Sequence, residues 1–205
     1  MFTGNRQDKT NKLILLSGGV ESTILAYLER PKYALTIDYG HIAAISEIKA
    51  AKAICKDLEI DLKIVKLDLS TIIHDSELFG NLSNLEENPE YVPFRNQFII
   101  TVGLQYAHAV GVDEIIIGTV KDDDIFFDGT PLFFEQLNLI SHAQHKIKIA
   151  TPAINTSALD LAKKSKIPIE ILAWSHSCTR ALHSCGECRS CRKRKTVLNF
   201  IRQTC

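Results

Sequence analysis

Short apolar runs alternate with longer segments of helical period through most of the chain. Strands joined by helices favour a parallel sheet, because the chain needs a long crossover connection, usually a helix, to start the next strand at the same end of the sheet. We therefore expect an α/β fold, a Rossmann-like parallel sheet with helices on both faces. The predicted strands are residues 13–16, 33–37, 63–67 and 114–118, and the predicted helices are residues 20–29, 43–55 and 98–110.

The composition is that of an ordinary globular protein. Hydrophobic residues make up 45% and charged residues 23%, and the formal net charge is zero, so no overall field favours a polyanionic partner. The first twelve residues are polar, and the apolar run after them is too short for a signal peptide or a membrane span. We expect a cytoplasmic protein without a membrane partner and without direct nucleic-acid binding.

Two changes of pattern divide the chain. Residues 74–93 are rich in Asn, Glu and Pro and predict a loop or lid. The alternation stops near residue 150, so we expect one domain over residues 1–150 and a C-terminal helical segment over residues 151–205. Within that segment Ser157 and Asp160 have capping-box spacing, and a short helix is predicted after Cys191. Earlier in the chain, Gly111 is the predicted C-cap of helix 98–110.

A glycine pair joins the first predicted strand to the first predicted helix, in the sequence LILLSGGVEST. The N–H groups and the dipole of a helix N-terminus favour an anion, and Gly18 and Gly19 let a ligand approach the backbone closely. Hydroxyl donors are present at Ser17, Ser22 and Thr23. The pattern favours phosphate or pyrophosphate binding, and the alternative is a tight turn with glycine at its corner. It matches neither the lysine-containing nucleotide loop nor the three-glycine dinucleotide motif.

Four of the six cysteines lie close together near the C-terminus, with the spacing C-x6-C-x2-C-x2-C. Four thiolates complete a tetrahedron around a structural Zn²⁺, and binding such an ion stabilises a segment too small to bury its own core. An iron–sulfur cluster is the competing interpretation, and free thiols are the third. We expect zinc on Cys178, Cys185, Cys188 and Cys191, with His176 and His183 as ordinary neighbours rather than ligands. Cys55 is predicted to be a small core residue.

Six basic residues and no acidic one follow Cys188, namely Arg189, Arg192, Lys193, Arg194, Lys195 and Arg202. Such a cluster is typical either of phosphate contacts or of a solvated helix beside a metal module. We favour the solvated helix.

The segment SGGVES, residues 17–22, resembles the S-G-G-x-D-S loop of N-type ATP pyrophosphatases, and nearly the whole chain resembles the 7-cyano-7-deazaguanine synthase family, QueC. The order of the loop, a V-P-x-R-N segment and the four-cysteine element carries this likeness. The matching residues are Asp38-Tyr39-Gly40, Val92-Pro93-Phe94-Arg95-Asn96, Ile115-Ile116-Ile117-Gly118, Thr151-Pro152 and Trp174-Ser175 followed by Cys178 and CGECRSC.

The resemblance implies an adenine nucleotide alpha hydrolase type of fold with a small zinc-binding appendage. It implies an enzyme that binds ATP with Mg²⁺ and adenylates the carboxylate of 7-carboxy-7-deazaguanine, releasing pyrophosphate. Ammonia then displaces AMP to give an amide, and a second activation dehydrates the amide to the nitrile. A homodimer is implied as well.

The same resemblance assigns residues to roles. Arg95 would clamp a phosphate, with a structural ion pair as its alternative. Residues 122–124 would hold Mg²⁺ or recognise a purine-like edge, and a solvated turn is the alternative. The implied catalytic residues are Ser17, Glu21, Arg95 and Lys121; the ATP-binding residues are Leu16, Ser17, Gly18, Gly19, Val20, Glu21, Ser22, Thr23, Asp38, Arg95, Asn96 and Gly118; the substrate-binding residues are Asp122, Asp123 and Asp124.

The chain also departs from the family pattern. Glu21 stands where the family has Asp, His41 replaces a Gln, and Phe94 replaces a Gly. The family's substrate segment is replaced by KDDDIFFDGTPLFF, residues 121–134, and the first gap of the cysteine element is shorter. The acyl substrate and the nucleophile are therefore less firmly implied than the ATP site.

Three other functions stay open on the sequence. The activated deazaguanine could be passed to a protein amine, as in anti-phage defence systems that contain QueC-like enzymes. The chain could be a nucleotide-binding module that has lost its chemistry. It could also be a tRNA-acting sulfur-transfer or lysidine-type enzyme, although neither a tRNA-binding domain nor a catalytic cysteine pair is recognisable.

Overall fold

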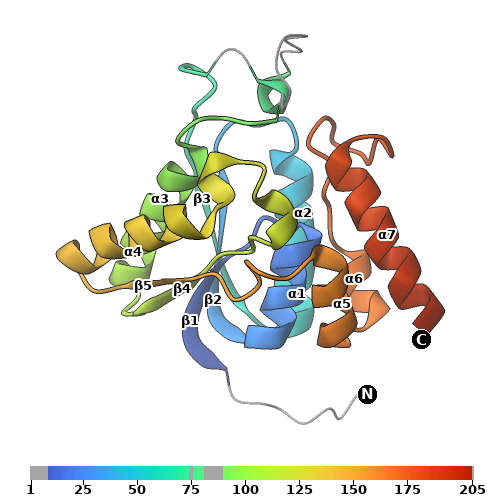
Figure 1. Ribbon diagram of the computed structural model, residues 1–205, viewed down its shortest axis with the longest axis horizontal. Helices are drawn as coiled ribbons and strands as arrows, with labels where there is room; N and C mark the ends of the chain where they lie inside the picture. Colours follow the sequence, from blue (N-terminus) through green and yellow to red (C-terminus); the bar gives the residue numbers. More distant parts are fainter. Residues whose placement is uncertain (1–8, 74–75, 81–89, 205) are drawn as a thin grey trace.

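The computed structural model describes residues 9–73, 76–80 and 90–204, and its centre is a five-stranded parallel sheet (Figure 1). The strand order is β3-β2-β1-β4-β5, so the chain builds outward from β1 in both directions. The predicted α/β fold is confirmed. The strands are β1 (Thr10–Leu15), β2 (Pro31–Asp38), β3 (Asp61–Lys66), β4 (Glu114–Ile116) and β5 (Lys148–Ala150).

Helices cover both faces of this sheet (Figure 1). Ile14 packs with residues of α1 (Val20–Glu29) and α2 (Ala44–Leu58), and Leu13 packs with residues of α3 (Arg95–Ala109) and α4 (Pro131–Gln144). Consecutive strand residues therefore point into two separate apolar clusters, as the two-residue period of a strand requires. Cys55 is buried in the first cluster, as predicted.

The C-terminal segment adds a further layer on the α1 side of the molecule. Helix α5 (Ala158–Ser165) packs against α1, and α7 (Arg189–Thr204) packs against α5 and the short α6 (Ile169–Ala173). Leu161, Val197 and Leu198 belong to the same apolar cluster as β1 and α1. The division of the chain at residue 150 stays a prediction.

Several element boundaries follow local chemistry. Ser157 Oγ accepts a hydrogen bond from the Asp160 N–H at 3.1 Å and caps α5, as its spacing predicted. Gly111 lies just beyond α3 and its C-cap Val110, and it has a φ of +70°. Its N–H donates to the carbonyl of His108 in the last turn of α3, as is typical of a glycine that ends a helix. The helix predicted after Cys191 is wrong in start and length, because α7 begins at Arg189 and runs for sixteen residues.

Helix α4 and strand β5 were not predicted. Helix α4 begins with Thr130 as its cap and Pro131 in its first turn, and β5 is only three residues long. The loop predicted over residues 74–93 lies largely outside the described residues, and its described part contains the 3₁₀ turn η1 (Glu77–Phe79). Within the described ranges, no helix combines the length and apolar character needed to cross a membrane.

Because all five strands are parallel, their carboxyl ends share one edge of the sheet. The connections that follow β1, β2 and β4 at this edge carry the Ser-Gly-Gly loop, Tyr39 to His41, and Gly118. Open parallel sheets bind their ligands at this edge, beside a change in the direction of strand order. In this fold that change occurs at β1.

Candidate functional site

The Ser-Gly-Gly loop is held tightly against α2. Gly18 has a φ of +77°, and a Cβ on it would lie 2.9 Å from both the Ala50 Cβ and the Glu47 carbonyl oxygen. Its own carbonyl accepts a hydrogen bond from the His176 N–H at 2.7 Å, which joins the loop to the C-terminal segment. Only glycine fits this corner without a shift of α2 or of the loop.

Hydroxyl groups brace the loop from within. The Ser17 and Ser22 Oγ atoms are 3.1 Å apart, and Ser17 Oγ accepts from the Gly19 N–H at 3.2 Å. The buried Thr23 donates to the Gly19 carbonyl at 2.6 Å. Gly19 is the N-cap of α1 and has no side chain with which to cap it. The first-turn N–H groups of α1 therefore have no partner within the helix, and such groups can bind an anion.

A cavity of about 320 Å³ lies in front of this loop, at the carboxyl edge of the sheet. Eight of the residues predicted for the site line it: Leu16, Ser17, Glu21, Ser22, Arg95, Asn96, Gly118 and Asp123. The other predicted residues lie outside its lining: Gly18, Gly19, Val20, Thr23, Asp38, Lys121, Asp122 and Asp124. Of these, Val20 is part of the core, and Lys121 and Asp124 are exposed at the surface.

Gly118 sets how closely the connection after β4 approaches the start of α1. A Cβ on Gly118 would lie 3.1 Å from the N, Cα and Cβ atoms of Ser22. The connection after β4 thus meets the first turn of α1 at the cavity wall. A side chain here would push the two apart.

Two of the three predicted substrate aspartates, Asp122 and Asp123, have side-chain partners in the protein. Asp122 accepts from the Ala158 N–H at 3.0 Å at the start of α5, and Asp123 Oδ2 accepts from the Val120 N–H at 3.2 Å. Asp122 therefore helps to position α5, and of the three only Asp123 reaches the cavity. Their assignment to substrate stays a prediction.

Arg95 lies at the first position of α3, beside two polar side chains. Burial raises the pKa of the Tyr39 hydroxyl to about 12, and the nearby Arg95 guanidinium opposes that rise. Asn96 donates to the Asp128 carbonyl oxygen at 3.1 Å, which holds the start of α3 to the segment before α4. Phe94 has a φ of +63° and turns the chain into α3 with its own ring exposed.

Asp128 is a buried carboxylate beside the cavity that the sequence did not reveal. It is 4% exposed, and no side chain among the described residues donates a hydrogen bond to it. Burial raises its pKa, while the charge of Arg95 and the nearby backbone N–H groups of Asn96 and of Asp128 itself oppose that rise. Its neighbours Asn96 and Gly129 both line the cavity. A buried carboxylate without a side-chain donor can accept hydrogen bonds from a ligand.

Lys193 is the second residue that sequence analysis did not place in the site. The basic run after Cys188 favoured a solvated helix, and for Lys193 this interpretation is wrong. It extends from α7 to the cavity wall, where its Nζ lies 2.6 Å from Glu21 Oε1 and 3.3 Å from Asp123 Oδ1. Burial alone would lower the pKa of Lys193, but these two carboxylates raise it above its ordinary value. The ammonium joins the first turn of α1 to the connection after β4.

A histidine–glutamate pair completes the polar wall. His41 is buried and stacks on Tyr39, with ring centroids 3.9 Å apart. Its Nε2 lies 2.9 Å from Glu47 Oε2, and both residues line the cavity. Sequence analysis noted only the departure from the family pattern at position 41 and had no signal for the pairing with Glu47.

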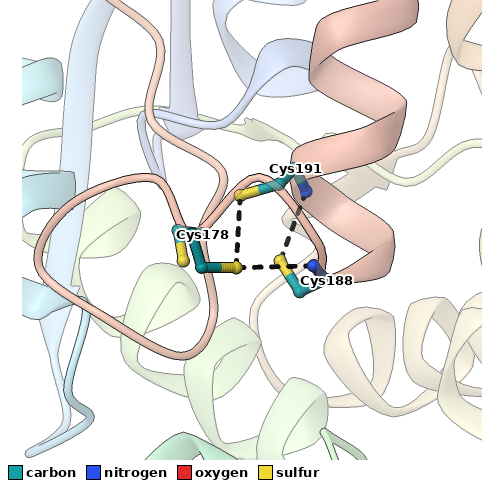
Figure 2. A group of neighbouring side chains, drawn as sticks. Cys178, Cys188 and Cys191 are labelled. Carbon is teal, nitrogen blue, oxygen red and sulfur yellow. Dashed lines mark hydrogen bonds between the residues drawn. The ribbon is translucent and has the colours of Figure 1, made fainter.

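The four cysteines come together at the N-terminal end of α7 (Figure 2). Their Sγ atoms all lie within 4.8 Å of one another, and Cys178, Cys188 and Cys191 are buried. N–H groups of Cys188 and Glu187 lower the pKa of Cys185 to about 6, and burial raises that of Cys191 to about 12. Four converging sulfur atoms fit a tetrahedral metal ion or a cluster. Neither His176 nor His183 belongs to the group.

Comparison with known proteins agrees with this arrangement. Residues 11–201 match the family model described as "Queuosine biosynthesis protein QueC". A 7-cyano-7-deazaguanine synthase of Thermoplasma volcanium is 34% identical over 89% of this chain and 83% of its own length. One of Pyrococcus furiosus is 30% identical over 94% of each chain.

Among solved structures, the NMN synthetase of Francisella tularensis aligns with a TM-score of 0.50 and 15% identity, over 94% of this chain and 84% of its own. At that identity the likeness concerns the fold alone. The sequence matches reach further, because they run through the Ser-Gly-Gly loop, the cavity residues of α3 and the four-cysteine element. On these matches the chain belongs to the QueC family.

Proposed function

We propose that this chain is an ATP-dependent, AMP-forming ligase that converts 7-carboxy-7-deazaguanine to 7-cyano-7-deazaguanine. The observation that carries the proposal is the uncapped start of α1, which opens with Ser17, Ser22 and Arg95 onto one cavity. Helix N-terminal N–H groups and a guanidinium are the groups that bind phosphate oxygens in proteins. Relatives that carry the synthase name match along nearly the whole chain.

In the proposed reaction a carboxylate oxygen of the substrate attacks the α-phosphorus of ATP, and the bond to pyrophosphate breaks. Ammonia then attacks the acyl carbon, loses a proton to solvent and expels AMP, which leaves the amide. In a second cycle the amide oxygen attacks the α-phosphorus of another ATP, and pyrophosphate leaves. AMP then leaves, the amide nitrogen gives up both protons, and the nitrile forms. The protein contributes mainly position and charge neutralisation on the phosphate oxygens.

Magnesium is proposed to enter with ATP and to neutralise phosphate charge. The carboxylates near the loop are already engaged, Glu21 and Asp123 by Lys193 and Asp122 by the Ala158 N–H. A dedicated protein cage for Mg²⁺ is therefore not part of the proposal, and ATP phosphates supply the main ligands.

The deazaguanine base is proposed to bind beside Asp128. A guanine-like edge presents a ring N–H and an amino group, which together match the two oxygens of one carboxylate. Asp128 has two such oxygens without a side-chain donor among the described residues and lies next to the cavity-lining residues Asn96 and Gly129. The deazaguanine would then lie at the end of the cavity toward α3, and ATP at the end toward α1.

Zinc is the proposed metal at the four cysteines. The sulfur atoms suit a closed structural site, which holds the start of α7 in place. Elemental analysis of the native protein tests this, with about one zinc per chain expected from a four-thiolate site. Iron in the native protein, together with a brown colour, would instead indicate an iron–sulfur cluster at the four cysteines. The homodimer is likewise a proposal, and light scattering tests it.

The decisive experiment follows products by mass spectrometry. Purified protein is incubated with ATP, Mg²⁺ and 7-carboxy-7-deazaguanine, with and without ammonium. Without ammonium the acyl adenylate should form and release pyrophosphate once per active site; AMP turnover and the nitrile are expected only with ammonium. Arg95→Gln should abolish the products, and Arg192→Gln, an exposed arginine on α7, is the matched control that should not.

Other outcomes identify the competing functions. AMP and pyrophosphate without nitrile, together with a deazaguanine mass added to a candidate partner protein, would mean conjugation to a protein amine. Binding of ATP without any AMP would mean a nucleotide-binding module. Tight binding of bulk tRNA with a steep salt dependence would favour the tRNA-acting class.

A further inference from the structure

A negative charge stands in the first turn of the helix that would receive the triphosphate. Glu21 is the second residue of α1, and it lines the cavity in front of the Ser-Gly-Gly loop. Asp123, from the connection after β4, lines the same wall. Two carboxylates beside an anion site repel a nucleotide whose phosphates carry several negative charges.

The ammonium of Lys193 lies between these two carboxylates. Its Nζ is 2.6 Å from Glu21 Oε1 and 3.3 Å from Asp123 Oδ1, and its side chain is 20% exposed. Charges that are this close and this shielded from water compensate each other far better than an exposed pair does. Among the ion pairs of described residues, this one involves the first turn of α1, whereas the Lys12–Glu29 pair lies at the last residue of that helix.

Helix α7 presents Lys193 to the cavity in a fixed register. Arg189 lies one turn earlier, lines the same cavity and donates to the Asp122 carbonyl oxygen. Arg194 is fixed on the other side of the helix, where it donates to Ser175 Oγ and to the Ala173 carbonyl, each at 3.0 Å. Lys193 therefore reaches the loop from an anchored helix rather than from a solvated one.

We propose that Lys193 is a positioning residue of the ATP site, which neutralises Glu21 and Asp123 so that the start of α1 can accept the triphosphate. This inference rests on the proposed function, because it takes ATP as the ligand of the loop. A purely structural ion pair would join α7 to α1 with no bearing on phosphate charge. The positioning role predicts a loss of affinity for ATP but not for adenosine, whereas the structural role predicts the same change in affinity for both.

The test measures binding of ATP and of adenosine by calorimetry, with five proteins in parallel. They are the wild type, Lys193→Met, Lys193→Arg, the double variant Glu21→Gln/Lys193→Met, and Lys195→Met. Lys195 lies on the same helix and is exposed, so it controls for loss of a positive charge on α7. Metal content and unfolding temperature are recorded for each variant to exclude a misfolded sample.

Lys193→Met is expected to weaken ATP binding by about ten-fold or more and to leave adenosine binding within about two-fold. The double variant should recover at least about three-fold of that loss, since it removes one of the two carboxylates that Lys193→Met leaves without a positive partner. Lys193→Arg should bind ATP nearly as the wild type does, and so should Lys195→Met.

Equal weakening of ATP and adenosine, or a double variant as weak as Lys193→Met, would overturn the inference in favour of a structural pair. Unchanged ATP affinity in Lys193→Met would overturn it outright. A wild-type protein that binds no ATP would instead remove the proposed function on which the inference rests.

Discussion

Replacing Gly18 by alanine should damage both the fold and the nucleotide site. A left-handed φ costs a non-glycine residue about 1 kcal/mol or more, and Gly18 has a φ of +77°. The added Cβ would also lie 2.9 Å from the Ala50 Cβ and the Glu47 carbonyl oxygen. Overpacking of this kind costs about 1–3 kcal/mol, so the total should be about 3 kcal/mol.

Gly111→Ala is the matched control. Its φ of +70° is similar, but nothing lies within 4 Å of the position of the added Cβ, so only the backbone cost of about 1 kcal/mol remains. Calorimetric unfolding should lower the melting temperature by about 3 °C for Gly111→Ala and by about 9 °C for Gly18→Ala. ATP binding should be lost only in Gly18→Ala. Equal shifts for the two variants would refute the claim that α2 confines the loop.

Three further predictions concern the metal, the buried carboxylate and the ion pairs at the other end of the sheet. Removing the metal with a chelator, or making Cys188→Ser, should lower the melting temperature by at least about 5 °C, measured by calorimetry. Asp128→Asn should leave the melting temperature unchanged or raise it, since a buried charge disappears, while calorimetry should show about ten-fold weaker binding of the deazaguanine. Burial raises the pKa of Glu114, but Lys148 and Lys12 outweigh this and lower it. A lowered carboxyl pKa stabilises the fold above the unfolded value near about 4.3 and loses this effect as pH falls through the folded value. Glu114→Gln should therefore destabilise by about 1 kcal/mol near neutral pH, with a smaller difference near about pH 3, in urea unfolding.

The sheet and most of its helices could be predicted from the sequence because their apolar periods are clear. Helix α1 was predicted with its observed bounds. Helix α4 was missed because its apolar residues do not keep to one face: Phe134 and Leu137 are buried, while Leu132 and Leu139 are exposed. Strand β5 is three residues long and offers too few positions for a period.

The candidate site likewise contains residues that the sequence reveals and residues that it does not. The Ser-Gly-Gly loop and the four cysteines are contiguous motifs whose spacing carries their chemistry, so the sequence reveals them. Lys193 gains its role from Glu21, which is far from it in the sequence. No local pattern reports such a pairing. A lysine in a basic stretch is typical of a solvent-facing helix, and only the tertiary fold directs this one inward.

Helix α7 carries both one of the four converging cysteines and the lysine that lines the cavity. Cys191 and Lys193 are two residues apart on this helix. An insertion or deletion of one residue between them would turn Lys193 by about 100° around the helix axis, away from Glu21. Lengthening of the segment between Cys178 and Cys185, which precedes the helix, would leave that register intact. Natural length variation in relatives with this pair should therefore collect before Cys185 and be absent after Cys188.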